Sequence, residues 1–372
     1  MNFILSRREL SKLMVMLIIA TVAFGLSGLV MIVIMQWMTL QSFAEDVKDK
    51  HGIAELQSSR LGGIAVALGV LIALGFAIMF AEDRDKVLAQ ISKGWPIWLG
   101  AISCFLLGLI EDFRNNSLSP RVRIAFKALA ITIVFILVPS LIPKSIGIWG
   151  VDSLLQSTVI AYAICIFFSV GFINAINTAD GANGLVAGIF VFTFCIFTLE
   201  FSHTIHPAGL QGASLFLLFN IVSGRLFLGD AGSYGIGAGL LFAGLSVLSE
   251  GLVSLPFLAA LYFYPCFDFL VSIIRRRHAG RPITEPDNDH LHNRLYRFYR
   301  LKVRSRTLAN SLTGLSLSGA TSGFVLIIYL AEGIPLVSDY WWFIFVVQIL
   351  AYFILFNRLS NKKPGIKKIR SK

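Results

Sequence analysis

Polar side chains recur at every third residue in the segment 171–185, where a long apolar run ends. They are Asn174, Asn177, Asp180 and Asn183, and Gly181 and Gly184 accompany them. On a helix this spacing forms one slowly winding stripe of amide and carboxylate groups. Glycine permits positive φ and lets a phosphate approach the backbone closely. The stripe therefore predicts a site for a metal-bound phosphate, and a capped helix end is the plainer alternative.

A second acidic feature, Glu111-Asp112, closes another apolar run. Adjacent carboxylates repel each other, so a cation is a natural partner, and hard oxygen ligands favour Mg²⁺, with Mn²⁺ as the alternative ion. Pro120 then fits the first turn of the next helix, followed by Arg121 and Arg123. These two cations either meet a lipid phosphate or anchor the helix at the membrane edge.

Asp230 lies between glycines, just before a helix expected to open near Ser233. A helix N-terminus with close-approach glycines is a ready anion site, and an aspartate there can hold a metal against the anion. Asn220 lies ten residues upstream inside an apolar run. A buried amide is expensive unless it is paired, so we interpret Asn220 as functional.

The segment 275–307 is the longest polar connection and is rich in arginine. His290 and His292 lie two residues apart in it, and Arg276 lies near its start. Arginine forks onto phosphate oxygens, so this loop is interpreted as a clamp for the pyrophosphate of a nucleotide sugar. For some of the arginines, a signal for membrane orientation is the alternative.

The composition predicts a membrane protein, because 56% of the 372 residues are hydrophobic and only 14% are charged. A soluble domain carries about 25% charged residues. Apolar runs long enough to cross a bilayer recur along the chain. We expect a single all-α domain over residues 1–372, a polytopic bundle of about eleven transmembrane helices. The expected spans are 13–38, 62–81, 95–110, 121–138, 158–176, 184–199, 212–226, 233–249, 252–274, 308–331 and 340–357.

The loops between these spans fall alternately on two sides, and most of the 32 Lys and Arg residues lie on one of them. The positive-inside rule makes that side cytoplasmic. The polar features above all fall on it, which predicts a cytoplasmic-face active site. The +11 net charge then reflects topology, with the basic tail 358–372 facing anionic lipid headgroups, and no nucleic acid is expected. Arg7, Arg8 and Lys12 lie on the other side, and a ten-span alternative would remove that conflict.

The motifs resemble, in order and over about residues 40–300, those of the polyprenyl-phosphate N-acetylhexosamine-1-phosphate transferases of glycosyltransferase family 4. The branch that transfers GlcNAc-1-phosphate to undecaprenyl phosphate is closer than the lipid I synthase branch. The segments that carry the resemblance are Arg60–Gly63, Gly108–Asp112, Asn174–Leu185, Phe227–Ser233 and Asp287–Asn293.

The resemblance implies transfer of a sugar-1-phosphate from a UDP-N-acetylhexosamine to undecaprenyl phosphate, releasing UMP, in the bacterial inner membrane. It implies Mg²⁺ as cofactor, initiation of O-antigen or other envelope polysaccharide, and leaves a homodimer open. The implied catalytic residues are Asp112, Glu111 and Asp180, and the metal ligands are Asp230 and Asp112. The implied donor-binding residues are Asn177, Asn183, Asn220, Arg276, His290 and His292. Those for the lipid phosphate are Arg60, Arg121 and Arg123.

The chain also departs from the family pattern. Glu111 and Asn183 each replace an aspartate, Asn293 replaces a histidine, and Ser58-Ser59 stand where prolines are usual. These changes leave an altered donor sugar or a non-catalytic scaffold as alternatives. An ion-coupled transporter is a third alternative, which predicts acidic residues near the bilayer midplane and an internal repeat. The sequence shows no such repeat.

Overall fold

The computed structural model describes residues 7–41, 58–114, 118–201, 203–283, 285 and 287–360. Within these ranges the chain is helical, and its one strand-like contact is an isolated parallel bridge between Ser59 and Leu226. The helices are α1 (Arg7–Met38), α3 (Gly62–Phe80), α4 (Arg84–Lys93), α5 (Trp95–Arg114), α6 (Pro120–Leu137), α7 (Trp149–Leu155), α8 (Thr158–Ala179), α9 (Leu185–Glu200), α10 (Ile205–Ser223), α11 (Gly229–Ser249), α12 (Leu255–Leu261), α13 (Phe263–His278), α14 (Leu291–Lys302), α15 (Arg306–Ser318), α16 (Phe324–Leu330) and α17 (Trp341–Ser360). A 3₁₀ turn (Pro139–Leu141) follows α6, and a π-helical turn (Gly319–Gly323) joins α15 to α16.

Each of the eleven expected spans corresponds to a helix or a continuous helix pair. Among the described residues, eight are long and apolar enough to cross a membrane, and α12 with α13 forms a ninth bent by 80°. The helices of the other two expected spans are less suited to crossing a membrane, because α9 has only 16 residues and α6 contains Arg121, Arg123 and Lys127. The prediction of an all-α polytopic membrane protein is confirmed. The basic tail beyond residue 360 lies outside the described residues.

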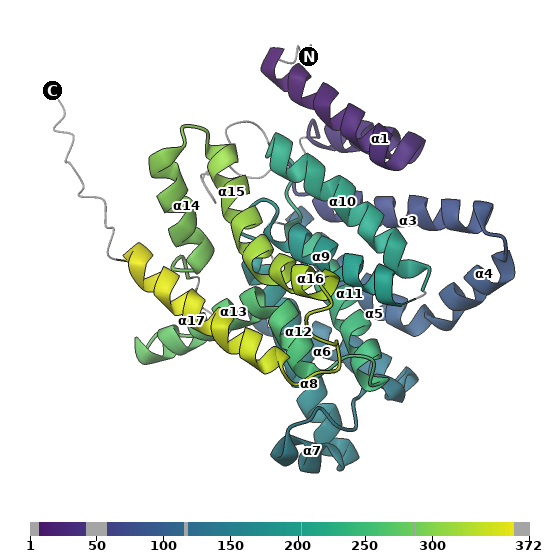
Figure 1. The fold of residues 1–372 in the computed structure, drawn as a ribbon, viewed down its shortest axis with the longest axis vertical. Helices are drawn as coiled ribbons and strands as arrows, with labels where there is room; N and C mark the ends of the chain where they lie inside the picture. The colour runs from purple at the N-terminus through teal and green to yellow at the C-terminus, as the bar shows by residue number, and fades with distance from the viewer. Residues whose placement is uncertain are drawn as a thin grey trace.

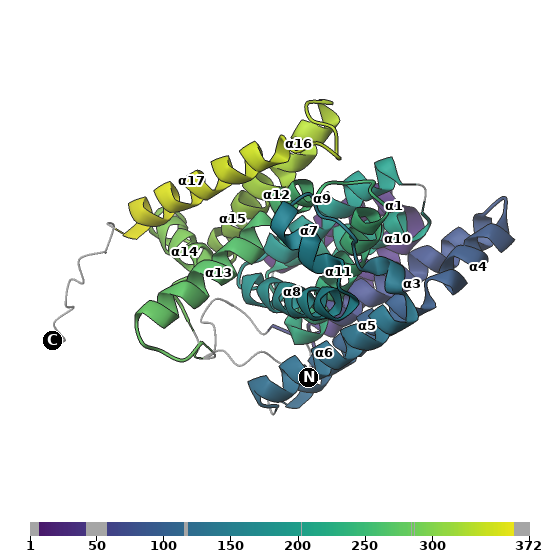
Figure 2. The same cartoon turned by 90° about the horizontal axis from the view of Figure 1, so that it is seen from below.

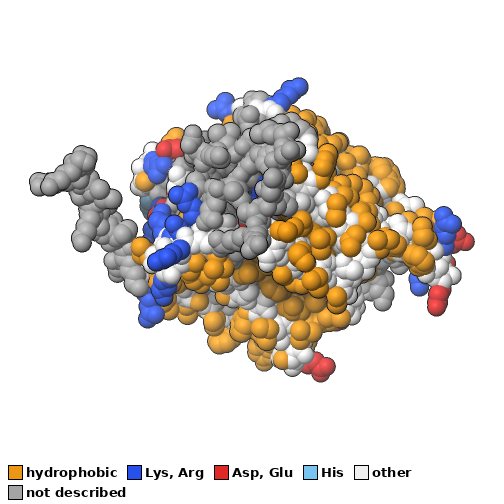
Figure 3. Space-filling model, turned by 90° about the horizontal axis from the view of Figure 1, so that it is seen from above, with side chains coloured by type: hydrophobic (Ala, Val, Ile, Leu, Met, Phe, Trp, Pro, Cys, Tyr) orange, Lys and Arg blue, Asp and Glu red, His pale blue; other side chains and the backbone are white. Residues whose placement is uncertain are grey.

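The centre of the bundle is α11, which packs against α3, α5, α8 and α9. Peripheral helices instead expose large apolar side chains, such as Val22, Phe167 and Phe343. Hydrophobic side chains cover much of the face in Figure 3, and Lys and Arg gather at its margins. An exposed apolar girdle of this extent suits a hydrocarbon surrounding.

The bend between α12 and α13 is stabilised from two other helices. The carbonyl of Ala260 accepts a hydrogen bond from Gln348 Nε2 at 3.2 Å, and that of Leu261 accepts one from Ser322 Oγ at 2.6 Å. A break in a transmembrane helix frees backbone carbonyls that lipid cannot satisfy. Side chains of α17 and the π-helical turn satisfy them here. The bend therefore belongs to the packed bundle.

The bundle has two distinct ends. Helix α4 lies at one end, and the connection between α13 and α14 lies at the opposite end in both ribbon views (Figures 1 and 2). Hydrogen bonds and close backbone contacts join the polar motifs to one another, and His292 connects the loop after α13 to them.

Candidate active site

The Arg60–Gly63 segment pairs backbone to backbone with the segment that precedes α11. The amides of Gly62 and Gly63 donate to the carbonyls of Phe227 and Leu228 at 2.9 and 2.8 Å. Ser59 exchanges similar bonds with Arg225 and Phe227. A Cβ on Gly63 would lie 2.3 Å from the backbone nitrogen of Gly232. The glycines therefore allow the N-termini of α3 and α11 to touch.

Asp112, near the end of α5, caps the start of α11. Its Oδ1 accepts the amide of Asp230 at 3.0 Å, and its Oδ2 accepts the amide of Ala231 at 2.8 Å. A carboxylate suits a helix N-terminus because it satisfies free N–H groups and matches the helix dipole. Arg60 lies near enough to act electrostatically on the Asp112 carboxylate. Asp112 thus connects three of the motifs.

Glu111 turns to different partners, although it is adjacent in sequence. Its side chain is fully buried, with Oε1 accepting the amide of Leu118 at 2.9 Å and Oε2 lying 3.4 Å from Arg123. The cation beside Glu111 is thus Arg123, and a metal ion shared by the two adjacent carboxylates stays a prediction. Glu111 fixes the connection to α6 and engages Arg123. Arg121 is exposed in the first turn of α6.

Three aspartates come within electrostatic reach of one another. Burial, and then the charges of Asp230 and Asp112, raise the pKa of Asp180 well above its ordinary value. Across the described ranges, no three His, Cys, Asp or Glu side chains close on one point as a ready-made metal cage. Mg²⁺ usually takes only one or two carboxylates and completes its shell with water and substrate phosphate. The donor set fits an ion of that kind.

The asparagines of the stripe bond to side chains of different helices. Asn177 Oδ1 accepts a hydrogen bond from Ser233 Oγ of α11 at 2.6 Å. Asn174 Oδ1 accepts one from Nζ of Lys127 on α6. Lys127 is 1% exposed and its ammonium lies 4.0 Å from the centre of the Tyr234 ring. The stripe therefore holds α6, α8 and α11 together, and it places a buried lysine beside the acidic cluster.

Asn220 has its hydrogen bonds satisfied by the protein. Its Oδ1 accepts the amide of Gly184 at 2.7 Å, and its Nδ2 donates to the carbonyl of Leu226 at 2.8 Å and to Asn183 Oδ1 at 3.4 Å. Both asparagines are buried, at 4% exposure. The Asn220 amide joins the turn before α9 to the segment before α11, and its role in donor binding stays a prediction. Asn220 positions these segments, and Asn183 lies in the same contact.

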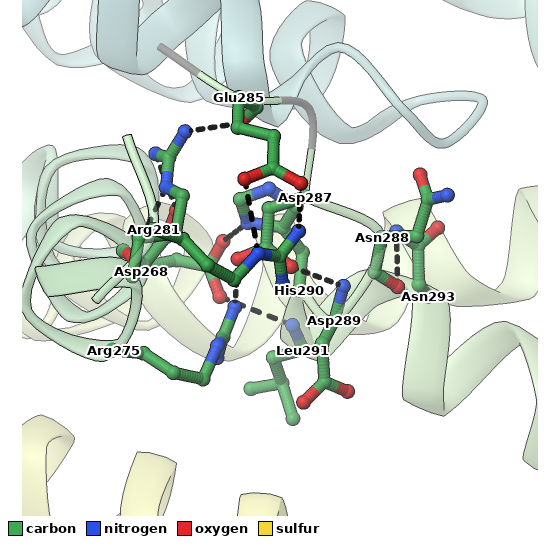
Figure 4. A network of polar contacts seen from close by, with 12 residues as sticks. Asp268, Arg275, Arg281, Glu285, Asp287, Asn288, Asp289, His290, Leu291 and Asn293 are labelled. Atoms are coloured by element: carbon green, nitrogen blue, oxygen red, sulfur yellow. Dashed lines mark hydrogen bonds and ion pairs between the residues drawn. The ribbon is translucent and has the colours of Figure 1, made fainter. Parts of the chain in front are cut away.

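The two histidines of the 275–307 segment stand side by side at the start of α14. Their rings are parallel, with centroids 5.3 Å apart. His290 Nδ1 bonds Asp268 Oδ2 at 2.6 Å (Figure 4), and His292 Nδ1 bonds Tyr264 Oη at 2.9 Å. A Cβ on Gly181 would lie 2.4 Å from His292 Nε2, so this ring reaches the turn after Asp180. Burial lowers the pKa of His292 to about 4, so the ring is neutral at physiological pH.

Arginines of this loop are bound within the protein. The guanidinium of Arg276 donates to Ser272 and to the carbonyl of Glu285, and that of Arg294 pairs with Asp289. Arg275 pairs with Asp287, and both residues are labelled in the polar network of Figure 4. Arg276 is only 8% exposed. Arg276 therefore shapes the loop that presents the histidines, and its role in gripping the pyrophosphate stays a prediction.

Sequence reasoning missed two tyrosines that support the histidines. Tyr264 bonds His292, and the hydroxyl of Tyr352 on α17 donates to Asp268 Oδ1 at 2.7 Å. A signal for Tyr264 existed, because it lies four residues before Asp268 and so shares its helix face. Tyr352 offered none, since its partner lies on a distant helix.

Comparison with known proteins decides the family. Residues 95–250, which hold Asp112, Asp180 and Asp230, match glycosyl transferase family 4. The chain is 30% identical over 295 residues to the decaprenyl-phosphate N-acetylglucosaminephosphotransferase of Mycobacterium leprae. That alignment covers 71% of this chain and 72% of the relative. The chain belongs to glycosyl transferase family 4.

Two other relatives indicate which branch of enzymes the chain resembles most. Identity is 26% over 306 residues to the probable undecaprenyl-phosphate N-acetylglucosaminyl 1-phosphate transferase of Bacillus subtilis, covering 78% of this chain and 80% of the relative. Identity is 20% over 310 residues to the phospho-N-acetylmuramoyl-pentapeptide-transferase of Staphylococcus carnosus. That alignment covers 77% of this chain and 93% of the relative. The predicted resemblance is confirmed, including the greater similarity to the N-acetylglucosaminyl branch. The chain is a multi-pass membrane protein of this sugar-phosphate transferase family.

Proposed function

We propose that this protein transfers N-acetylglucosamine-1-phosphate from UDP-N-acetylglucosamine to a polyprenyl phosphate, undecaprenyl phosphate in the first instance, and releases UMP. The names of its relatives support the two substrates. The observation that carries the proposal is the junction of Asp112 with the N-terminus of α11, beside Asp180 and Asp230. This junction unites an anion-binding helix end with carboxylates that suit a divalent ion.

The reaction is a phosphoryl transfer, which depends on positioning and charge neutralisation more than on covalent chemistry. An oxygen of the lipid phosphate attacks the β-phosphorus of the donor, and the bond from that phosphorus to the bridging oxygen breaks as UMP leaves. A phosphate monoester has a second pKa of about 6, so the lipid needs little help from a base near pH 7. Bound Mg²⁺, held by Asp230 with Asp112 or Asp180, would neutralise charge on the pyrophosphate.

The chain's own groups supply the positioning. Asp112 holds the start of α11 in place, and Asn177 fixes Ser233 one turn further along. The Nε2 edge of His292 lies against Gly181, next to Asp180, where a donor phosphate would meet it. Lys127 brings a buried ammonium group within electrostatic reach of Asp230 and Glu111.

The orientation follows from the distribution of charge. The loop after α13 and the helix α14 carry a dense set of arginines at the same end as the histidines. We infer that this end faces the cytoplasm of a bacterial inner membrane, where UDP-sugars are made. A lipid-linked sugar diphosphate formed there would initiate a cell-envelope polysaccharide such as O-antigen.

The test is UMP release by purified protein in detergent, with undecaprenyl phosphate, Mg²⁺ and a panel of UDP-N-acetylhexosamines. Turnover should require the lipid and the ion, and it should be lost in Asp112→Asn and Asp230→Asn. Asp83→Asn is the matched control, because Asp83 is an exposed aspartate capping α4 at the opposite end. Folded protein that releases no UMP from any donor would overturn the proposal.

A further inference from the structure

The hydroxyl of Tyr264 fixes which ring nitrogen of His292 carries the proton. The backbone N–H of His292 donates to Tyr264 Oη at 3.0 Å, and His292 Nδ1 lies 2.9 Å from the same oxygen. A backbone amide can only donate, so the tyrosine oxygen accepts there and its own proton is left for Nδ1. If Nδ1 carried the proton instead, the buried hydroxyl would have no acceptor in the described part of the chain, which is costly. The neutral ring therefore carries its proton on Nε2.

Asp268 imposes the opposite arrangement on His290. Its carboxylate accepts the amide of Leu291 at 3.0 Å, the hydroxyl of Tyr352 at 2.7 Å and Nδ1 of His290 at 2.6 Å. Three converging donors stabilise the charged carboxylate, which can only accept. In its neutral form His290 therefore keeps its proton on Nδ1 and leaves a lone pair on Nε2.

We propose that Tyr264 and Asp268 lock the two stacked histidines in opposite tautomers, so that they present one Nε2–H donor and one Nε2 acceptor side by side. Within the described residues no protein group bonds either Nε2 atom. Resting on the proposed function, this pair recognises a ligand that carries an oxygen acceptor next to a hydroxyl, as a nucleotide sugar does. His292 donates to a phosphate oxygen, and His290 accepts from a hydroxyl of the donor. Tyr264 is then a positioning residue for the donor.

The tautomers can be read directly by NMR of the full chain in detergent, with ¹⁵N-labelled histidine rings. Signals are assigned with His290→Gln and His292→Gln. The wild type should show protonated Nε2 in His292 and protonated Nδ1 in His290. Tyr264→Phe should convert His292 to a mixture and leave His290 unchanged. Tyr162→Phe is the control, because its hydroxyl bonds the carbonyl of Phe135 in another part of the bundle. The same tautomer in both rings, or no change at His292 in Tyr264→Phe, would overturn the proposal.

Kinetic measurements distinguish a positioning role of Tyr264 from a role in stability alone. Loss of one oriented hydrogen bond should raise KM for the UDP-sugar about tenfold in Tyr264→Phe and leave KM for the lipid unchanged. His292→Gln, whose amide can replace Nε2–H, should retain more activity than His292→Asn, whose amide replaces Nδ1. Equal activity of the two variants, or an equal rise in both KM values, would contradict the proposal. The NMR result does not depend on turnover. Wild-type protein that uses no UDP-sugar would therefore overturn the proposed function and leave the tautomer assignment standing.

Discussion

The carboxylate of Asp112 holds the backbone amide of Asp230 at 3.0 Å, and so joins the end of α5 to the start of α11. Asp112, which the family resemblance implies to be catalytic, thereby fixes Asp230, the residue proposed to hold the metal. Any change at Asp112 should act both on the packing of α11 and on the reaction. This coupling distinguishes Asp112 from its neighbour Glu111, which points to α6.

Asp112→Asn should abolish turnover and also reduce stability. An amide nitrogen cannot accept a hydrogen bond, so one of the two α11 amides loses its partner, at a cost of about 1–3 kcal/mol. Glu111→Gln should cost much less activity, because an amide oxygen can still accept the amide of Leu118. Turnover and the thermal midpoint in detergent, measured for both variants, check this contrast. Equal loss of turnover in both variants would contradict the separate roles.

Asn220→Ala should destabilise the protein strongly. It leaves the amide of Gly184 and the carbonyl of Leu226 buried without a partner, each costing about 1–3 kcal/mol. The thermal midpoint should fall, and donor binding should weaken only as the fold loosens. Asn288→Ala is the control, since that side chain is exposed. An Asn220→Ala variant with unchanged midpoint and a raised KM would restore a direct role in donor binding.

Gly63→Ala should disrupt the junction of α3 with α11. The added Cβ would lie 2.3 Å from the backbone nitrogen of Gly232, a distance that forces the helices apart. Gly75→Ala on the same helix meets nothing within 4 Å and should stabilise the helix by roughly 0.5–1 kcal/mol. Turnover and thermal midpoint of the two variants provide the measurement. Tolerance of alanine at Gly63 would show that the backbone junction is looser than the structure indicates.

The raised pKa of Asp180 predicts how Mg²⁺ and pH act together on stability. Above about pH 4 the unfolded chain loses this proton while the folded chain keeps it, so stability without metal should fall as pH rises through the raised pKa. Mg²⁺ favours the ionised carboxylate, so its stabilising effect should grow with pH. Thermal midpoints at pH 5.5 and 8.5, with and without Mg²⁺, test this. Asp180→Asn should weaken both dependences, and a metal effect that is independent of pH would exclude Asp180 from the ion's surroundings.

The sequence predicted which segments meet, but it predicted less about what each side chain touches. Apolar run lengths located a helix or helix pair for each of the eleven expected spans, and their alternation placed Asp112, Asp180 and Asp230 at one end. Whether a polar side chain faces a substrate or a backbone amide depends on tertiary contacts that spacing does not encode. The spacing predicts functional roles for Asn220 and Glu111, and it does not predict the bonds that both side chains make to the protein's own backbone.

The bend between α12 and α13 had a sequence signal, because Pro265 has no N–H to bond the carbonyl of Leu261. Gln348 and Ser322, which satisfy the freed carbonyls, lie in distant segments and had none. Tyr352, which bonds Asp268 from a distant helix, likewise had no sequence signal. Polar residues within apolar runs marked the site, but their partners emerged only from the packing.

The most direct measurement follows the β-phosphorus of the donor. Wild-type protein is incubated with undecaprenyl phosphate, Mg²⁺ and UDP-N-acetylglucosamine labelled with ³²P at the β-phosphate, and the label is located after extraction of the lipid. Transfer of sugar-1-phosphate predicts label in the lipid and unlabelled UMP in equal amount, with none in Asp112→Asn. Label recovered as UDP, with the sugar alone on the lipid, would mean that the bond between the sugar and the β-phosphate breaks. That result would contradict the proposed reaction.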